Sequence, residues 1–276
     1  WVCVLSCCSL ACLYVGSLHI WRINLPSDHL SVIKRRCTSV LVAALSLALV
    51  KLWTYWADVR VVGSVWQMMG LRLEGLLPAA VLPLLLRVVP TTHVQHLMHL
   101  CFWPLPTFCK HVITHKCSWR LCASDPVWLR NQVVAPLTEE VVFRGAMLPM
   151  LVPCTAPTTA IFIAPLFFGT AHLHHLFEQQ LLSKDYTRAT FLASGVQFLY
   201  TTVFGVFAAF IFLRTGHVIA PVLCHSFCNS QGLPDISSAL RHPQPTAVLF
   251  SYLMGLLMFL LLLFPSTDPF FYGIIP

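Results

Sequence analysis

Long apolar runs are the feature of this sequence that most restricts its fold. Of the 276 residues, 57% are hydrophobic and only 10% are charged, and the mean hydropathy is +0.76, far above what a soluble domain of this length requires. A bilayer core about 30 Å thick is crossed by about 20 helical residues. Eight runs approach that length: residues 2–21, 39–57, 76–90, 127–150, 158–175, 191–213, 216–233 and 246–264. The sequence therefore predicts an all-α, polytopic membrane bundle of about eight transmembrane helices.

The basic residues of the connecting segments predict how this bundle lies in the membrane, because short cytoplasmic loops carry an excess of Lys and Arg. Ten such residues follow the first, third, fifth and seventh runs, and three lie on the other side. The larger group is Arg22, Lys34, Arg35, Arg36, Lys110, Lys116, Arg120, Lys184, Arg188 and Arg241, and the smaller is Arg60, Arg72 and Arg214. The larger group is expected in the cytoplasm, with both chain ends opposite. The net charge of +7 comes mostly from these loops, whose basic residues are expected to face anionic lipid headgroups. No nucleic-acid partner is therefore implied.

A single integral membrane domain is expected over residues 1–276. No repeat or linker interrupts the chain, and the polar motifs are confined to a core at about residues 125–264. The sequence begins inside an apolar run at Trp1, without Met, so we expect its true N-terminus to be missing. The 12 Cys residues include no CxxC pair, and a disulfide framework is not expected.

Two glutamates and an arginine lie inside the fourth apolar run, where charged side chains are costly and mark functional sites. Helical spacing places Glu140 and Arg144 one turn apart as an ion pair, whereas Glu139 lies about 100° around the helix. Glu139 would then have the environment of a general base. The alternative is a buried ion pair with Glu139 as a bystander.

Two later runs supply histidines. His172 follows Phe168 by one helical turn, and His225 precedes Asn229 by one turn on the same face. Rigid donors around a developing oxyanion stabilise acyl transfer, so His225 and Asn229 are candidate donors. Taken alone, His172 could be a solvated residue at a helix end, and the other pair could make interhelical hydrogen bonds. The predicted topology places all three segments near one depth, which favours a shared intramembrane catalytic cavity.

The three segments match the motifs EExxxR, FxxxH and HxxxN, at Glu139–Arg144, Phe168–His172 and His225–Asn229. With their surroundings, from about residue 125 to 275, they resemble the type II CAAX prenyl endopeptidases (Ras-converting enzymes) of the CPBP family of intramembrane proteases. The resemblance implies a glutamate-type protease in the endoplasmic reticulum membrane, with its site accessible from the cytoplasm. Its substrates would be prenylated CaaX proteins, such as small GTPases of the Ras type, from which it would remove the C-terminal aaX tripeptide.

The resemblance also assigns roles, carried over motif by motif. Glu139 with His172 would activate water, and His225 with Asn229 would hold the oxyanion. No metal and no other cofactor is expected, and the surrounding membrane lipid would accommodate the prenyl chain. The residues expected to support the catalytic groups are Glu140, Arg144 and Phe168, with binding of the substrate carboxylate as a lesser alternative for Arg144.

From the residues alone, other functions remain open. Glu139, His172 and His225 could be the three protein ligands of a catalytic zinc, although the HExxH pattern is absent. Cys224 or Cys228 beside His225 could serve a thiol protease. The chain could also be non-catalytic, either a membrane protein that binds prenyl peptides or a transporter. Cleavage of a prenylated peptide with and without chelator would separate these functions.

Overall fold

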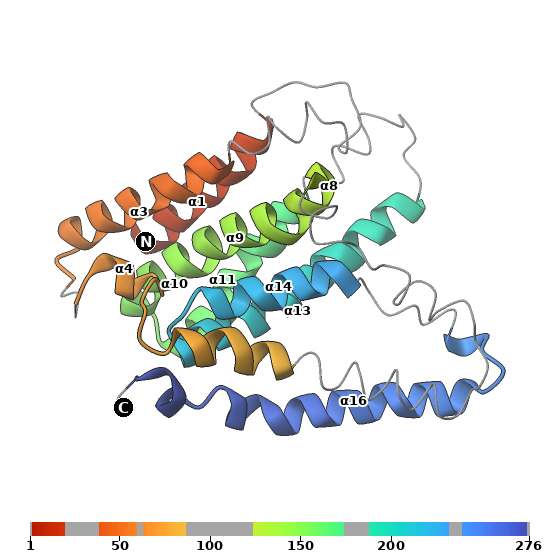
Figure 1. Ribbon diagram of the computed structural model, residues 1–276. Coiled ribbons are helices and arrows are strands. Elements are labelled where there is room, and N and C mark those ends of the chain that lie inside the picture. Colours follow the sequence, from red (N-terminus) through yellow and green to blue (C-terminus); the bar gives the residue numbers. More distant parts are fainter. Residues whose placement is uncertain are drawn as a thin grey trace.

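The computed structural model describes residues 2–19, 39–59, 63–86, 124–173, 188–231 and 239–274, and every regular element within them is helical (Figure 1). This confirms the all-α prediction. Most of the basic residues on which the predicted orientation depends lie in 20–38, 87–123 and 174–187, which are outside the described residues.

The helices follow the predicted apolar runs. The N-terminal part contains α1 (Val2–His19), α3 (Ser39–Trp56), the short α4 (Val65–Met68) and an apolar helix at Leu76–Leu86. The fourth run is one composite helix made of α8 (Pro126–Leu129), η1 (Arg130–Val134), α9 (Ala135–Glu140), η2 (Val141–Ala146) and α10 (Met147–Leu151). The later elements are η3 (Val152–Cys154), α11 (Pro157–His172), α13 (Arg188–Thr215), α14 (Ile219–Gln231), α16 (Pro245–Ser266) and η4 (Pro269–Tyr272).

Within the described part of the chain, three helices are long and apolar enough to cross a membrane: Ser39–Trp56, Phe191–Thr215 and Pro245–Ser266. In each of these helices, at most 33% of an apolar 18-residue stretch is buried inside the protein. Many large apolar side chains of these helices are exposed, whereas a soluble monomer rarely exposes large contiguous apolar patches, so these side chains face lipid. The chain is a multi-pass membrane protein, while the full number of eight spans stays a prediction.

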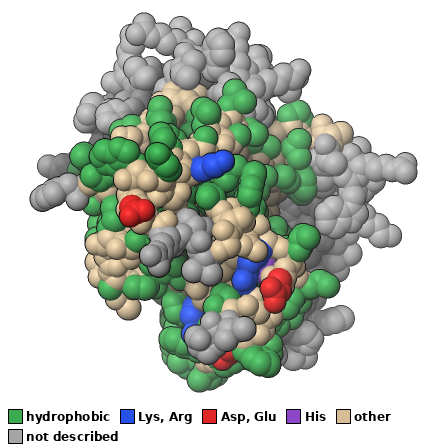
Figure 2. Space-filling view, turned by 90° about the vertical axis from the view of Figure 1, so that its left-hand side faces the viewer, with side chains coloured by type: hydrophobic (Ala, Val, Ile, Leu, Met, Phe, Trp, Pro, Cys, Tyr) green, Lys and Arg blue, Asp and Glu red, His purple; other side chains and the backbone are tan. Residues whose placement is uncertain are grey.

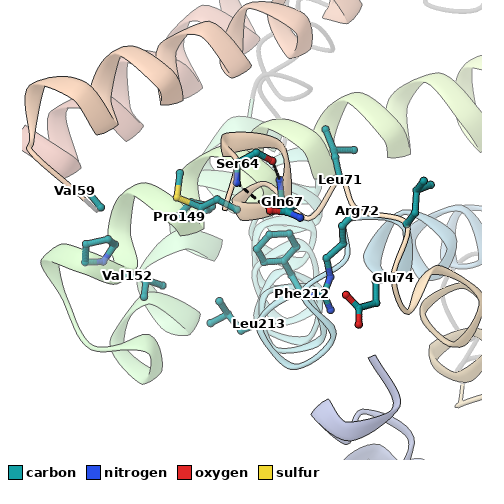
Figure 3. A pocket seen from close by; sticks show the side chains of 13 residues that line it. Val59, Ser64, Gln67, Leu71, Arg72, Glu74, Pro149, Val152, Phe212 and Leu213 are labelled. Carbon is teal, nitrogen blue, oxygen red and sulfur yellow. Dashed lines mark hydrogen bonds between the residues drawn. The ribbon is translucent and has the colours of Figure 1, made fainter. Parts of the chain in front are cut away.

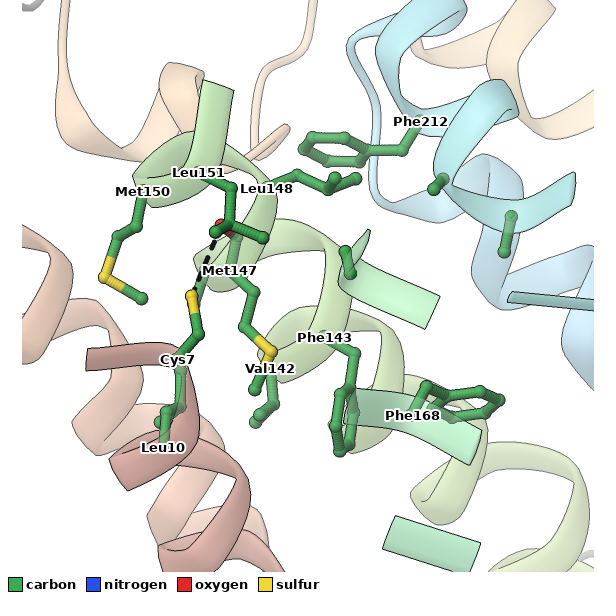
Figure 4. Close-up of a cluster of buried hydrophobic side chains, with 14 of the residues drawn as sticks. Cys7, Leu10, Val142, Phe143, Met147, Leu148, Met150, Leu151, Phe168 and Phe212 are labelled. Atoms are coloured by element: carbon green, nitrogen blue, oxygen red, sulfur yellow. Dashed lines mark hydrogen bonds between the residues drawn. The ribbon is translucent and has the colours of Figure 1, made fainter. Parts of the chain in front are cut away.

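The core lies where the composite helix packs against α1 and α11 (Figure 4). Its completely buried members include Cys7 and Leu10 of α1, Val142 and Phe143 of η2, and Met147, Leu148 and Leu151 of α10. Lipid tails are as apolar as these side chains, so helix association in a membrane depends on close packing rather than on burial from water. This packed centre fixes the composite helix that carries the two glutamates.

A disulfide joins Cys3, in the first turn of α1, to Cys154 at the end of η3. The sequence did not predict this bond, because the two residues are 151 positions apart and no short spacing indicates the pair. It ties the start of α1 to the turn between α10 and α11.

Arg72 connects three distant segments in what we call the Arg72 clamp, formed by Gly70, Arg72, Thr215, His217 and Tyr272. The Arg72 Nε–H donates to Nε2 of His217 (3.2 Å), and Nη2 donates to the carbonyls of Thr215 (3.4 Å) and Tyr272. Gly70 has a φ of +77°, and a Cβ there would lie 2.7 Å from the backbone nitrogen of Val218, which donates to the Gly70 carbonyl (3.1 Å). Only glycine adopts this conformation without strain at so close an approach.

The Arg72 clamp gives a pH-dependent contribution to stability through His217. Burial, and then the adjacent Arg72 guanidinium, lower the pKa of His217 below its usual value, and Nε2 must be unprotonated to accept from Arg72. Below about pH 6.5 the unfolded state binds the proton more readily than the folded state, so stability falls with decreasing pH. We expect His217→Gln to flatten the pH dependence of the thermal midpoint between about pH 5 and 7, measured by scanning fluorimetry in detergent. Equal slopes for the two proteins would contradict this.

Candidate active site

The composite helix departs from α geometry on both sides of the glutamates, with the π-turns η1 before them and η2 after them. Such wide turns are frequent at functional sites. Within η1, the carbonyl of Asn131 would accept from residue 136, but Pro136 has no N–H. The side chain of Asn229 supplies the missing donor, because its Nδ2 lies 2.9 Å from the Asn131 oxygen. This bond docks the end of α14 on the start of the composite helix.

Glu139 lies between the two predicted histidines. Its Oε2 is 3.9 Å from Nε2 of His172 and 3.8 Å from Nε2 of His225, longer than direct hydrogen bonds. The oxygen is buried and accepts no hydrogen bond from a described residue. Side chains from α9, α11 and α14 thus converge on one oxygen, as the prediction of a shared site requires.

Glu140 has more partners than the expected ion pair. Its Oε1 accepts from Nη1 of Arg144 (3.1 Å) and also from Nδ1 of His225 (2.8 Å). Glu140 and Arg144 are almost completely buried, with exposed fractions of 0% and 2%. The predicted Glu140–Arg144 pair is present, and through Glu140 it also orients His225.

The hydrogen bonds of the two imidazoles define where their protons are. A carbonyl and a carboxylate only accept, so Nδ1 of His172 donates to the Phe168 carbonyl (2.8 Å) and Nδ1 of His225 donates to Glu140. With Nδ1 protonated, the Nε2 atom of each neutral ring is an acceptor. Both Nε2 atoms lie beside Oε2 of Glu139, where protons can be exchanged with the carboxylate.

Two phenylalanines surround the charged groups. The guanidinium carbon of Arg144 lies 4.1 Å from the centroid of Phe168 and 5.9 Å from that of Phe204. Phe168 also makes an edge contact with His172 (4.5 Å), and the Phe204 ring lies 5.0 Å from His225. Cation–π attraction is strengthened where water is excluded, so the predicted supporting residue Phe168 and the unpredicted Phe204 both hold this cluster in place.

The sequence did not indicate the contribution of α13. Phe204 lies in a long apolar helix without a polar motif, so nothing distinguished it from lipid-facing phenylalanines. The adjacent Gly205 could have indicated a helix contact here, because small residues permit close helix contacts in membranes. A Cβ on Gly205 would lie 2.8 Å from Cβ of Pro165 and 3.3 Å from Nη2 of Arg144. Gly205 thus lets α13 approach α11 at the site.

Asn229 is the predicted residue that the structure does not bring to Glu139. Its side chain is exposed, and its Nδ2 donates to the Asn131 carbonyl. An amide nitrogen carries two N–H groups, so one donor remains after this bond. The shared role of His225 and Asn229 at an oxyanion therefore stays a prediction.

Removing Arg144 tests the electrostatic balance of the buried pair. Arg144→Met leaves Glu140 buried without its cation, which costs about 3–5 kcal/mol when one partner of a buried pair is lost. We expect a large fall in the thermal midpoint in detergent. The double variant Glu140→Gln/Arg144→Met is the control and should recover most of the lost stability. Equal midpoints for the single and double variants would show that the pair is not coupled in this way.

Two alternative sites gain no support from the described residues. No group of three His, Cys, Asp or Glu side chains among them is placed to hold a metal ion. The Cys224 thiol contacts the Pro83 carbonyl (3.5 Å), and Cys228 is buried in the core. These contacts give both thiols packing roles.

The helical membrane fold and the buried Glu–His cluster together define the class: an intramembrane protein with a hydrolase-type site. The comparisons with known proteins agree. The family described as type II CAAX prenyl endopeptidase Rce1-like matches residues 124–231, which contain the whole cluster. No solved structure matches the chain.

Similar proteins extend the match over the entire chain. Human CAAX prenyl protease 2 is 51% identical over 280 residues, covering 100% of this chain and 84% of that protein. The rat protein of the same name is 48% identical, covering 100% and 83%. CAAX prenyl protease 2 of Arabidopsis thaliana is 43% identical over 150 residues, covering 53% of this chain and 46% of that protein. The chain belongs to the family of type II CAAX prenyl endopeptidases, which confirms the resemblance drawn from the motifs.

Proposed function

We propose that this protein removes the aaX tripeptide from prenylated CaaX proteins in the endoplasmic reticulum membrane, with small GTPases of the Ras type among its substrates. The observation that carries the proposal is the convergence of His172 and His225 on Oε2 of Glu139, inside the segment that matches the endopeptidase family. The reaction is hydrolysis of the peptide bond that follows the prenylated cysteine.

Glu139 and His172 form the water-activating pair in this mechanism. A water beside Oε2 of Glu139 attacks the scissile carbonyl while the carboxylate accepts its proton, a general-base step worth about 10²–10⁴ in rate. Nε2 of His172, held by the bond from Nδ1 to Phe168, orients the water and shares the proton. The proton then passes to the nitrogen of the departing aaX tripeptide.

His225 stabilises the oxyanion in this mechanism. With Nδ1 donating to Glu140, Nε2 becomes a donor when the ring carries a second proton. The second N–H of Asn229, one turn along α14, is the additional donor in this assignment. Arg144 is occupied by Glu140 and two aromatic rings, which favours a structural role over binding of the substrate carboxylate.

The proposed arrangement in the membrane has eight spans, one catalytic domain and a site that opens to the cytoplasm. The disulfide supports this orientation, because the predicted topology places Cys3 and Cys154 on the non-cytoplasmic side and disulfides persist in oxidising compartments. A prenyl chain loses about 0.8 kcal/mol per CH₂ on leaving hydrocarbon. The lipid tail therefore enters the site sideways from the bilayer.

Release of the aaX tripeptide from a synthetic peptide tests the proposal. Purified protein should cleave a farnesylated CaaX peptide, and the same peptide without the prenyl group should be cleaved at least about 100-fold more slowly, because it lacks the membrane anchor. Equal turnover of the two peptides would contradict the proposed substrate. Binding of the prenylated peptide without cleavage would instead indicate the non-catalytic alternative.

A further inference from the structure

A cavity lies well away from the Glu139 cluster. It has a volume of about 890 Å³ and is lined by residues of the α3–α4 connection, α4, the segment after α4, α10, η3 and the end of α13. Pro149 of its wall is ten residues from Glu139 along the composite helix, about 15 Å at the helical rise. Phe212 of its opposite wall is eight residues from Phe204, about 12 Å. The cavity is therefore separate from the site of hydrolysis.

This cavity is amphipathic. Figure 3 shows Arg72 and Glu74 on one side of it, Pro149 and Val152 on the opposite side, and Phe212 between them. Figure 2 shows the corresponding face of the molecule, on which a basic and an acidic group lie next to each other among mostly uncharged side chains. A cavity of this volume and lining is typical of small-molecule sites, which combine apolar walls with a few placed polar groups.

The two charged side chains retain binding capacity. Nε and Nη2 of Arg72 donate within the Arg72 clamp, whereas the two N–H groups of Nη1 have no partner among the described residues. Glu74 is exposed at the rim, and no ion pair within the described part of the chain involves it. The Arg72 clamp fixes the guanidinium in place, so its free N–H groups are presented without further loss of side-chain entropy.

The surroundings place the cavity at a membrane surface. Trp66 of α4 is 53% exposed beside it, and Leu73 of its lining is 87% exposed. Tryptophan is enriched where the bilayer meets water. The cavity also adjoins the Cys3–Cys154 disulfide through Val152 and Pro153, on the face that the predicted topology assigns to the non-cytoplasmic side.

We propose that this cavity binds a zwitterionic phospholipid of the non-cytoplasmic leaflet. The lipid phosphate accepts from Nη1 of Arg72, and the ammonium group pairs with the Glu74 carboxylate. The beginning of one acyl chain lies against Phe212, Leu213 and Val152. An anionic lipid satisfies Arg72 but places no cation on Glu74, so the pair selects phosphatidylethanolamine over phosphatidylglycerol.

Native mass spectrometry of the purified full chain, titrated with lipids of identical acyl chains, tests this proposal. Phosphatidylethanolamine should be retained about threefold better than phosphatidylglycerol, as one exposed ion pair allows, and diacylglycerol should be retained least. Glu74→Gln should abolish the preference between the two phospholipids. Leu213→Trp, which fills the cavity, should weaken phosphatidylethanolamine retention about tenfold.

Leu192→Trp is the control for lipids that merely coat the surface, because Leu192 is 69% exposed on the same helix, far from the cavity. It should retain lipid as the wild type does. Equal retention of the two phospholipids by the wild type would overturn the proposal, as would equal effects of the two tryptophan variants. Glu74→Gln removes only an exposed charge, so the test remains decisive if Leu213→Trp does not fold. Lipid retention is measured without peptide cleavage and does not depend on the proposed function.

Discussion

Replacing Glu139 with Gln is expected to lower kcat for the prenylated peptide by at least about 100-fold, because the amide preserves size but cannot accept the proton of the attacking water. The folded structure should persist, since Oε2 makes no hydrogen bond to a described residue that the substitution would remove. KM should change little. The measurement is steady-state cleavage of a farnesylated CaaX peptide by purified protein.

Asp58→Asn is the matched control for the loss of one carboxylate. Asp58 is exposed in the turn after α3 and has a φ of +48°, a conformation that Asn adopts readily. This variant should keep wild-type activity. Activity of Glu139→Gln within threefold of the wild type would remove Glu139 from the mechanism.

Replacing His225 with Ala should reduce kcat by about 10²–10³, the usual cost of losing one oxyanion donor. KM should remain within about twofold, because the interaction exists mainly in the transition state. The same peptide assay gives both constants. A rise in KM with unchanged kcat would instead assign His225 to substrate binding.

Asn229→Ala distinguishes the two roles open to that residue. If the second N–H of Asn229 serves the oxyanion, kcat should fall by about 10²-fold. If Asn229 only anchors the Asn131 carbonyl, the thermal midpoint should fall while kcat stays near the wild-type value. Measuring kcat and the thermal midpoint together therefore separates a catalytic role of Asn229 from a structural one.

Apolar length predicted the helices well, because the bilayer requires continuous helical hydrogen bonding in each run. The composite helix at 127–150 is the instructive case. Its existence and limits followed from hydropathy, but the two π-turns did not. The first of them, η1, depends on Pro136 and on a donor from a helix almost 100 positions away. The local sequence around Pro136 does not indicate such a distant hydrogen-bond partner.

For the candidate site too, the sequence predicted local features but not contacts between distant segments. Charges in apolar runs identified Glu139, Glu140, Arg144, His172 and His225, because such residues are costly in a membrane. The bond between Glu140 and His225 was not predicted, since helical spacing describes contacts within one helix only. Phe204, the Arg72 clamp and the Cys3–Cys154 disulfide depend on tertiary packing, and no motif marked them.

The most direct test of the proposed chemistry is the initial rate of aaX release by wild-type protein after exhaustive chelation. Glu139 and His172 activate water without a metal in the proposed mechanism, so the chelated protein should keep its rate within about twofold, against the 10²-fold or greater loss expected for a missing catalytic group. The zinc alternative uses Glu139, His172 and His225 as ligands and predicts loss of activity. Inactivation by chelator that stoichiometric zinc reverses would contradict the mechanism.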